Sequence, residues 1–330
     1  MDKSKMMFTI YNQLGTHMWT VKRPLDRNGR YVSDRVEDYE ESWRRRYEYA
    51  RKCGANTVSV DIGEMLQYPS HPEIWIKGAW SAEKMNGWVK WLKSLGYRDV
   101  IPSLNFSTDH DVWLGEYSRM ISTPKYYEVC RDLIRDAWEV FDHPRIINFG
   151  MDEEDYHVMG RSRSFKNAII IIRQGDLYWH DNLFFIREIE KLGAQAWMWS
   201  DKIWFEKEDY LKHIPKSVLQ GNWCYTPTFD LNNQPLPWYK ERIEAYSWLE
   251  EAGYDQIPGC SNYLNDSLRK KGMQLKDNHN IEETFRYCKK VIAPERLKGF
   301  HVMSWEGITP KDDGNFFLVC DMMRKAIDEF

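Results

Sequence analysis

The stretch Leu192-Gly193-Ala194-Gln195-Ala196-Trp197-Met198-Trp199 joins the end of one regular segment to the whole of the next. The preceding residues, 177–192, have the apolar spacing of an amphipathic helix. Gly193 is the residue type that most readily takes the left-handed conformation that ends a helix. The apolar run 194–199 is typical of a buried strand. The sequence therefore places a helix, a glycine and a strand in direct succession.

The same order recurs along the chain on both sides of this stretch. Glycines also stand between a helical pattern and a strand at Gly54, Gly96 and Gly253. Alternating strands and helices indicate parallel βαβ units, and eight units predict a single α/β domain over residues 1–330, a closed (β/α)8 TIM barrel. The predicted strands are 8–11, 56–62, 99–106, 145–149, 194–199, 218–223, 256–263 and 299–305, and the predicted helices lie near 41–53, 82–95, 125–141, 177–192, 207–213, 237–252, 281–292 and 315–328.

The connections differ in length according to their direction. Those from helix to strand are short, whereas those from strand to helix are long. Loops that follow the strands build the catalytic face of such a barrel, so we expect the chemistry at the carboxyl ends of the strands. The long connections span 63–80, 107–124, 150–176, 200–206, 224–236 and 264–280.

The composition describes an ordinary globular chain with 42% hydrophobic and 29% charged residues. Because the net charge is −4, neither nucleic acid nor a membrane surface is an expected partner. The sequence has no run of eighteen apolar residues, and the segment Met1–Lys5 is not a secretory signal. As the sequence stands we expect a cytoplasmic protein, or a periplasmic or secreted one if a signal was removed. The oligomeric state is left open.

Cysteine and tryptophan usage narrows the chemistry further. The six cysteines show no CxxC and no metal-type spacing, so we expect all six to be free and expect no metal or other cofactor. The 16 tryptophans either fill a large core or present flat indole faces to sugar rings. Those at the ends of strands are the candidates for a carbohydrate site.

Four acidic residues follow the predicted strand 145–149 in the run Gly150-Met151-Asp152-Glu153-Glu154-Asp155. Clustered carboxylates disfavour one another's ionised form, so such a run is costly unless it has a role. One interpretation of this run is a solvated acidic loop. Another is a metal site, but no histidine stands at a convenient ligand spacing on a helix, and His157 is the nearest one. The position at the carboxyl end of a barrel strand favours a catalytic centre.

The segment Gly150–Glu153 resembles the Gly-x-Asp-Glu signature of the family 20 glycoside hydrolases, the β-N-acetylhexosaminidases, which also ends strand four. Later strand ends agree with that family in order, and the resemblance covers residues 145–307. The matching segments are Trp197–Asp201, Gly221–Trp223, Ser261–Asn265, similar to the family's Tyr-Leu-Asp, and Ser304–Glu306, similar to its Trp-x-Glu.

The resemblance implies retaining, substrate-assisted hydrolysis of a glycan that contains an N-acetylhexosamine. In this scheme the substrate's 2-acetamido oxygen attacks the anomeric carbon and forms an oxazolinium ion. Glu153 would be the general acid, Asp152 would stabilise the oxazolinium ion and Tyr263 would align the acetamido oxygen. The predicted contacts to the carbohydrate substrate are Trp199, Asp201, Trp223, Asn265, Trp305, Glu306, Asn12 and His110.

Several departures from the family keep other functions open, among them strand three, which lacks the family's Glu after Pro, and Trp305-Glu306, which lacks the intervening residue. The first strand lacks the family's arginine and has Asn12 or His17 in its neighbourhood, and Asn265 stands where the family has Asp. One alternative is a retaining glycosidase whose nucleophile is Glu306 or Asp201. The others are a catalytically silent barrel that binds glycan and a metal-dependent barrel enzyme that acts on a small sugar.

Overall fold

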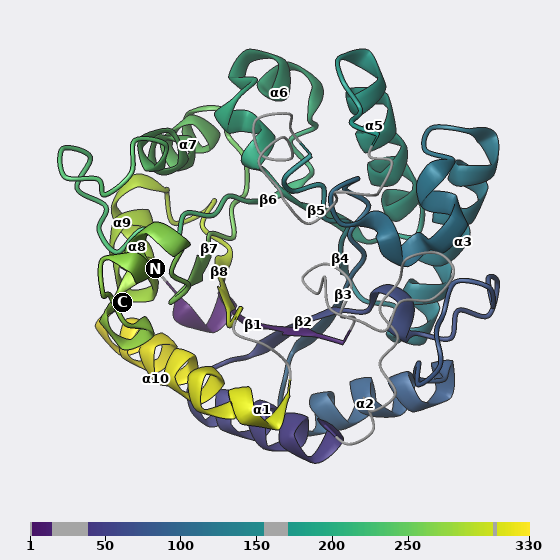
Figure 1. The fold of residues 1–330 in the computed structure, drawn as a ribbon, viewed down its shortest axis with the longest axis horizontal. Helices are drawn as coiled ribbons and strands as arrows, with labels where there is room; N and C mark the ends of the chain where they lie inside the picture. The colour runs from purple at the N-terminus through teal and green to yellow at the C-terminus, as the bar shows by residue number, and fades with distance from the viewer. Residues whose placement is uncertain (1, 15–38, 155–170, 306–308) are drawn as a thin grey trace.

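A computed structural model describes residues 2–14, 39–154, 171–305 and 309–330, which form a ring of parallel strands inside a ring of helices (Figure 1). The strands are β1 (Met7–Gln13), β2 (Thr57–Asp61), β3 (Asp99–Ser103), β4 (Ile146–Asn148), β5 (Gln195–Trp199), β6 (Leu219–Gly221), β7 (Gly259–Ser261) and β8 (Gly299–Met303). The helices are α1 (Glu40–Lys52), α2 (Ala82–Ser94), α3 (Pro124–Val140), α5 (Asp176–Lys191), α6 (Lys207–His213), α7 (Tyr239–Glu251), α8 (Asp266–Lys270), α9 (Asn280–Val291) and α10 (Asp313–Glu329).

The eight strands lie in the order β6-β5-β4-β3-β2-β1-β8-β7, and all neighbouring strands are parallel. Two backbone hydrogen bonds bridge the remaining gap between β6 and β7. The N–H of Gly259 donates to the carbonyl of Asn222 at 2.8 Å, and that of Ile257 donates to the carbonyl of Gln220 at 2.8 Å. The sheet thus closes on itself, which confirms the predicted (β/α)8 barrel.

The predicted helix ends are confirmed as well. Each predicted glycine that precedes a strand has a positive φ, which a side chain would make costly. The values are 101° at Gly54, 92° at Gly96, 80° at Gly193 and 81° at Gly253. The short joints between helices and strands therefore follow from local backbone chemistry.

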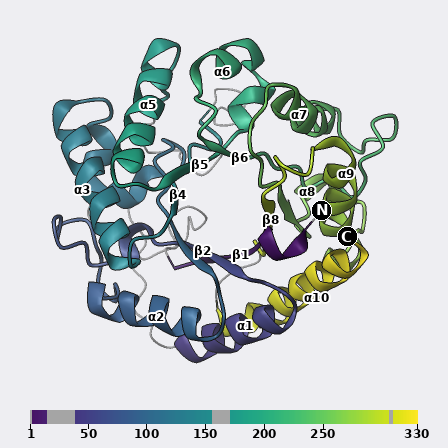
Figure 2. The ribbon, with the colours of Figure 1, turned by 180° about the vertical axis from the view of Figure 1, so that it is seen from behind.

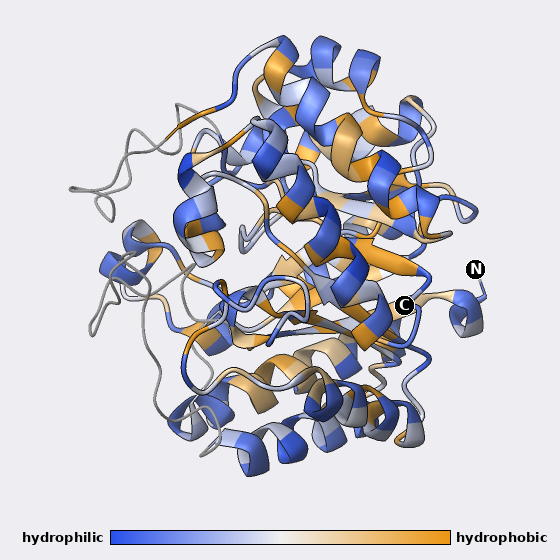
Figure 3. Cartoon of the chain, turned by 90° about the vertical axis from the view of Figure 1, so that its right-hand side faces the viewer, coloured by the Kyte–Doolittle hydropathy of each residue, from blue (hydrophilic) through white to orange (hydrophobic). Residues whose placement is uncertain are grey.

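Two hydrophobic clusters support the barrel from outside and from within. The larger one lies between the strands and the surrounding helices, whose apolar sides face inward in Figure 3. The smaller one collects side chains from around the whole strand ring, so these can meet only inside the barrel. Its members are Met7, Ile101, Ile146, Trp197, Leu219 and Ile257. Met7, Ile146 and Leu219 are the first residues of their strands and Ile257 precedes β7, so the cluster lies toward the amino-terminal end of the barrel interior.

The last helix packs beside the first and closes the outer ring, as Figure 1 and Figure 2 show from opposite sides. The buried Arg46 of α1 donates from Nε to Asp313 Oδ1 of α10 at 2.7 Å. Arg46 also donates from Nη2 to the carbonyl of Thr309 at 2.8 Å. The first and last helices of the barrel are therefore joined by a shielded ion pair.

The cysteines of the chain lie in its hydrophobic core. All six cysteines are free and buried, as their spacing predicted. Within the described ranges, the helices are too short or too polar to cross a bilayer. Burial raises the pKa of the Cys224 thiol to about 12, so this thiol is kept protonated in the core.

Candidate active site

The turn that follows β4, from Gly150 to Glu153, has an unusual backbone. The φ values of Gly150, Met151 and Glu153 are 76°, 76° and 61°. Such values at non-glycine residues cost about 1–3 kcal/mol each, so neighbouring groups must hold them. Asn105 Oδ1 accepts the Met151 N–H at 3.2 Å, and Asp201 Oδ2 accepts the Glu153 N–H at 2.8 Å. Strain stored beside two carboxylates is a feature of functional sites.

Asn105, which follows β3, fixes the first of these carboxylates. Its side-chain amide donates to Asp152 Oδ1 at 2.6 Å, while its oxygen also accepts the Ser107 N–H at 3.1 Å. A Cβ atom on Gly150 would lie 2.1 Å from Asn105 Oδ1, so only glycine fits there. Asn105 was not among the site residues predicted from the sequence. The available signal was a polar side chain at the end of an otherwise apolar strand.

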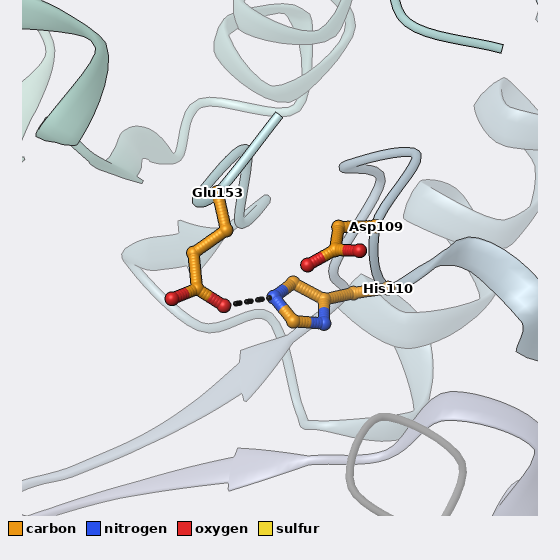
Figure 4. Close-up of side chains that lie close together, drawn as sticks. All are labelled: Asp109, His110 and Glu153. Atoms are coloured by element: carbon orange, nitrogen blue, oxygen red, sulfur yellow. Dashed lines mark ion pairs between the residues drawn. The ribbon is translucent and has the colours of Figure 1, made fainter. Parts of the chain in front are cut away.

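His110 lies against both predicted catalytic carboxylates, and Figure 4 shows its contact with Glu153. Its Nε2 atom is 3.3 Å from Asp152 Oδ2 and 3.3 Å from Glu153 Oε2. Burial opposes the charged imidazolium, but the two carboxylates outweigh it and raise the pKa of His110 well above its ordinary value. His110 is therefore held protonated between them. It is buried and does not line the cavity described below, so its predicted contact with substrate stays a prediction.

Asp109 adds a third acidic group beside His110. Burial raises the pKa of the Asp109 carboxyl to about 6, partly opposed by the charge of His110. One ligand atom each from Asp109, His110 and Glu153 lie within 4.8 Å of one another, a spacing that could hold a divalent ion (Figure 4). Such an ion would need a neutral His110, whereas the adjacent carboxylates favour the imidazolium. That the protein uses no metal stays a prediction.

Asp201, predicted to contact substrate, lies beneath the turn. Asp201 begins a short 3-10 helix, Asp201–Trp204, that follows β5, and its carboxyl is buried. Burial and the negative charge of Asp152 raise the pKa of Asp201 to about 8. Asp201 is not among the residues that line the cavity. In this structure it accepts the Glu153 N–H, and its predicted contact with substrate stays a prediction.

The third acid of the run, Glu154, serves the scaffold. It forms an ion pair with Arg173, whose Nε and Nη2 atoms donate to the two carboxylate oxygens at 2.8 and 2.6 Å. The N–H of Thr108 also donates to Glu154 at 3.0 Å, and Arg173 Nη1 reaches Asp181 of α5 at 3.1 Å. Both Arg173 and Glu154 are fully shielded from solvent. The network ties the loops after β3 and β4 to α5. The fourth acid, Asp155, lies outside the described residues.

A cavity of about 290 Å³ opens above Asp152 and Glu153. Both carboxylates line it, and the Glu153 side chain is 26% exposed against 11% for Asp152. Five other predicted residues line it as well, while four lining residues were not predicted. The predicted ones are Trp199, Trp223, Tyr263, Asn265 and Trp305, and the others are Tyr225, Trp238, Tyr239 and Arg242.

Aromatic rings form the walls of this cavity. Trp223 stacks on Tyr225 with 5.0 Å between ring centroids, and Tyr225 meets the edge of Tyr263 at 6.0 Å. Trp199 stacks on His301, a histidine inside the barrel, at 5.1 Å. Burial lowers the pKa of His301 to about 3, so His301 adds no charge to the cavity floor. A cavity of this volume with flat apolar walls suits one or two sugar rings.

Asn265 has both of its polar side-chain atoms engaged with the protein. Its oxygen accepts the Leu268 N–H at 3.0 Å and caps α8, and its amide donates to the Tyr239 hydroxyl at 2.7 Å. It lines the cavity as a fixed group. Its contact with substrate stays a prediction.

The strand-one residue that faces this site is Tyr11, whereas Asn12 points the other way. The Tyr11 hydroxyl donates to Asp61 Oδ2 at 2.8 Å, and its ring lies 5.1 Å from that of Trp305. Asn12 lines a separate small cavity with residues of α1 and α2, including Trp43. Because adjacent residues of a strand point to opposite faces, Asn12 is turned away from this cavity, and its predicted contact with substrate stays a prediction. Glu306 lies outside the described residues.

Comparisons with known proteins show likeness in fold. No family model and no curated protein matches the sequence. Among solved structures, the chain is similar to an exo-β-N-acetylglucosaminidase of glycoside hydrolase family 20 from Vibrio harveyi, with a TM-score of 0.60 and 11% identity over 97% of this chain and 54% of that one. The chain thus spans about half the length of the Vibrio enzyme.

Two further structures give the same result. A pneumococcal exo-β-D-N-acetylglucosaminidase module of family 20 aligns with a TM-score of 0.57 and 14% identity, over 98% of this chain and 85% of that one. A family 5 xyloglucanase from Paenibacillus pabuli aligns with a TM-score of 0.54 and 11% identity, over 98% of this chain and 99% of that one. The chain therefore has the barrel fold that is found in glycoside hydrolases of families 20 and 5.

Proposed function

We propose that this protein is a retaining glycoside hydrolase that cleaves a glycan containing an N-acetylhexosamine by a substrate-assisted mechanism. The observation that carries the proposal is the pair Asp152 and Glu153, which stands at the carboxyl end of β4 and opens into an aromatic cavity of about 290 Å³. Residues at this end of barrel strands carry the chemistry in barrel enzymes. The fold shared with the exo-β-N-acetylglucosaminidases supports the proposal.

The two carboxyl groups are set up for different tasks. Glu153 is the more exposed and would protonate the leaving oxygen as the bond to the anomeric carbon breaks. Asp152, fixed by Asn105 at 2.6 Å, would stay ionised and stabilise the positive charge of the oxazolinium ion. The His110 imidazolium, 3.3 Å from Asp152, would stabilise the ionised form of that carboxylate.

The aromatic walls would hold the sugar. Trp199, Trp223 and Trp305 present apolar faces against which the C–H groups of a pyranose ring can lie. Tyr263 lines the same cavity and would donate its hydroxyl to the acetamido oxygen, which aligns this oxygen for attack. Their positions around one cavity support the roles proposed for these residues.

A protein nucleophile is less consistent with the surroundings of Asp201. One of its oxygens accepts the Glu153 N–H at 2.8 Å, and its carboxyl is buried with a raised pKa. A carboxyl that is buried and protonated is a weak nucleophile. The substrate's own acetamido group supplies the nucleophile without moving Asp201.

Hydrolysis of nitrophenyl glycosides tests the proposal. The panel contains the β-glycosides of N-acetylglucosamine, N-acetylgalactosamine, glucose and galactose. We expect turnover of at least one 2-acetamido sugar and none of its plain counterpart. Equal turnover of plain glucosides would contradict the substrate-assisted mechanism, and binding of all four without turnover would point to a silent glycan-binding barrel.

A further inference from the structure

Arg242, in the first turn of α7, lines the cavity between two indole rings. Its guanidinium carbon lies 4.1 Å from the ring centroid of Trp204 and 4.7 Å from that of Trp223. Stacking on two rings fixes the plane of a guanidinium and partly strips it of water. The side chain is partly buried, so it is held in place at the cavity wall.

The guanidinium has no protein acceptor in the described part of the chain. Among the described residues, no carboxylate oxygen lies within 4.0 Å of its nitrogens, the limit for an ion pair, and no group accepts a hydrogen bond from its N–H groups. A guanidinium carries five donors, and leaving them without acceptors in a partly desolvated place is costly. The guanidinium carbon of Arg44 in α1 also lies 4.8 and 4.7 Å from the centroids of two indole rings. Arg44, however, forms an ion pair with Glu40 at 3.3 Å.

The surroundings of Arg242 favour an anion over a neutral group. Trp238 and Tyr239, which begin α7, line the same cavity, so the positive end of this helix faces it too. The two acids among the described lining residues, Asp152 and Glu153, already contact His110. Among the described lining residues, Arg242 is the one formal cation.

We propose that Arg242 binds an anionic group of the substrate, so that the glycan taken by this site is acidic. A planar guanidinium matches a carboxylate or a sulfate ester through two parallel hydrogen bonds. A uronic acid or a sulfated N-acetylhexosamine would supply such a group. This inference rests on the proposed function, because it assigns the substrate class of the same site.

Calorimetric binding of three monosaccharides tests the inference at low ionic strength. The probes are N-acetylglucosamine, N-acetylglucosamine 6-sulfate and glucuronic acid. We expect at least one acidic probe to bind about tenfold tighter than the neutral sugar, which corresponds to one hydrogen bond between charged groups. The better of the two acidic probes identifies sulfate or carboxylate as the group recognised.

Variants tie the preference to this residue. Arg242→Gln should abolish the preference, Arg242→Lys should keep part of it, and Arg44→Gln, the control on two indoles elsewhere, should leave it unchanged. In the wild-type protein the preference should also shrink as the salt concentration rises, a result that needs no variant to fold.

Three results would overturn the inference. They are an unchanged preference in Arg242→Gln, equal weakening of neutral and acidic probes in that variant, and no preference in the wild-type protein. If N-acetylglucosamine binds and the acidic probes bind no better, the assignment of Arg242 fails while the proposed function stands. If none of the three sugars binds, both fail.

Discussion

Among single residues, Glu153 has the most direct consequence for activity. Glu153→Gln keeps the size and hydrogen-bonding capacity of the side chain but removes its proton. We expect kcat/KM on glycosides with poor leaving groups to fall by about 10²–10⁴-fold, the usual contribution of general acid catalysis. The loss should be smaller for dinitrophenyl glycosides, whose leaving group needs no proton. An equal loss for both kinds of substrate would show that Glu153 is not the acid.

Asn105 acts through Asp152 and is a positioning residue. Asn105→Ala removes a hydrogen bond of 2.6 Å to a carboxylate, worth about 1.5–3 kcal/mol, and frees the Met151 N–H. We therefore expect kcat to fall about tenfold or more while KM changes little. Steady-state kinetics on a 2-acetamido glycoside measures the split. If Asn105 were only structural, the variant would lose thermal stability and keep its kcat.

Among the structural elements, the role of the turn after β4 can be tested by alanine substitution at two glycines that have similar φ values. Gly150 and Gly193 have φ values of 76° and 80°, so both substitutions to alanine incur conformational strain. An added Cβ on Gly150 would lie 2.1 Å from Asn105 Oδ1, whereas nothing lies within 4 Å of one on Gly193. The pair therefore separates steric fit at the site from backbone preference.

We expect Gly193→Ala to lower the free energy of unfolding by about 1 kcal/mol and to leave activity unchanged. Gly150→Ala should cost more and should also lower kcat, because Asn105 must move away from Asp152. Chemical denaturation and kinetics on both variants provide the comparison. Equal losses of stability, with full activity in both, would contradict the role of the turn.

The elements were predictable where local chemistry decides them. Gly193 and its counterparts end helices wherever they occur, and the apolar runs that follow can only be strands of a buried sheet. The position of Asp152 and Glu153 followed from the same order of elements. The side to which Asn12 points was not predictable, because every residue of β1 is buried and no alternation shows which side chains face the barrel interior.

Contacts between residues far apart in the chain could not be predicted, because they leave no local pattern in the sequence. Glu154 and Arg173 form a buried pair, yet each reads as an ordinary charged loop residue in the sequence. Asp201 was expected in the cavity, but the short helix that it begins turns the carboxyl under Glu153. The path of the chain after β6, which brings Trp238 and Arg242 to the cavity, depends on packing that spacing alone does not encode.

At the scale of the whole molecule, the buried acids should make stability depend on pH. The pKa of Asp201 is raised to about 8, whereas an unfolded aspartate titrates near pH 3.9. The folded state thus holds the proton more tightly. This contribution to stability is complete below about pH 4 and is lost as the pH rises through about 8.

Asp201→Asn removes this titration and keeps an oxygen that can accept the Glu153 N–H. The variant should therefore lose less stability than the wild-type protein between about pH 4 and pH 8. Asp61, whose pKa burial raises to about 7, acts in the same direction, so the difference between the two proteins is the informative quantity. Urea denaturation at several pH values measures it. Parallel pH profiles would mean that Asp201 titrates normally.

In the proposed mechanism the substrate's acetamido group is the nucleophile and Asp152 stabilises the ion formed. The most direct measurement is the Kd of a stable thiazoline mimic of the oxazolinium ion, for the wild-type protein and for Asp152→Asn. Sites complementary to such a charged, cyclised state bind its analogues far more tightly than substrate. We predict tight binding to the wild-type protein and much weaker binding to Asp152→Asn. Equal, weak binding to both, together with a covalent fluorosugar on a protein carboxylate, would contradict the account.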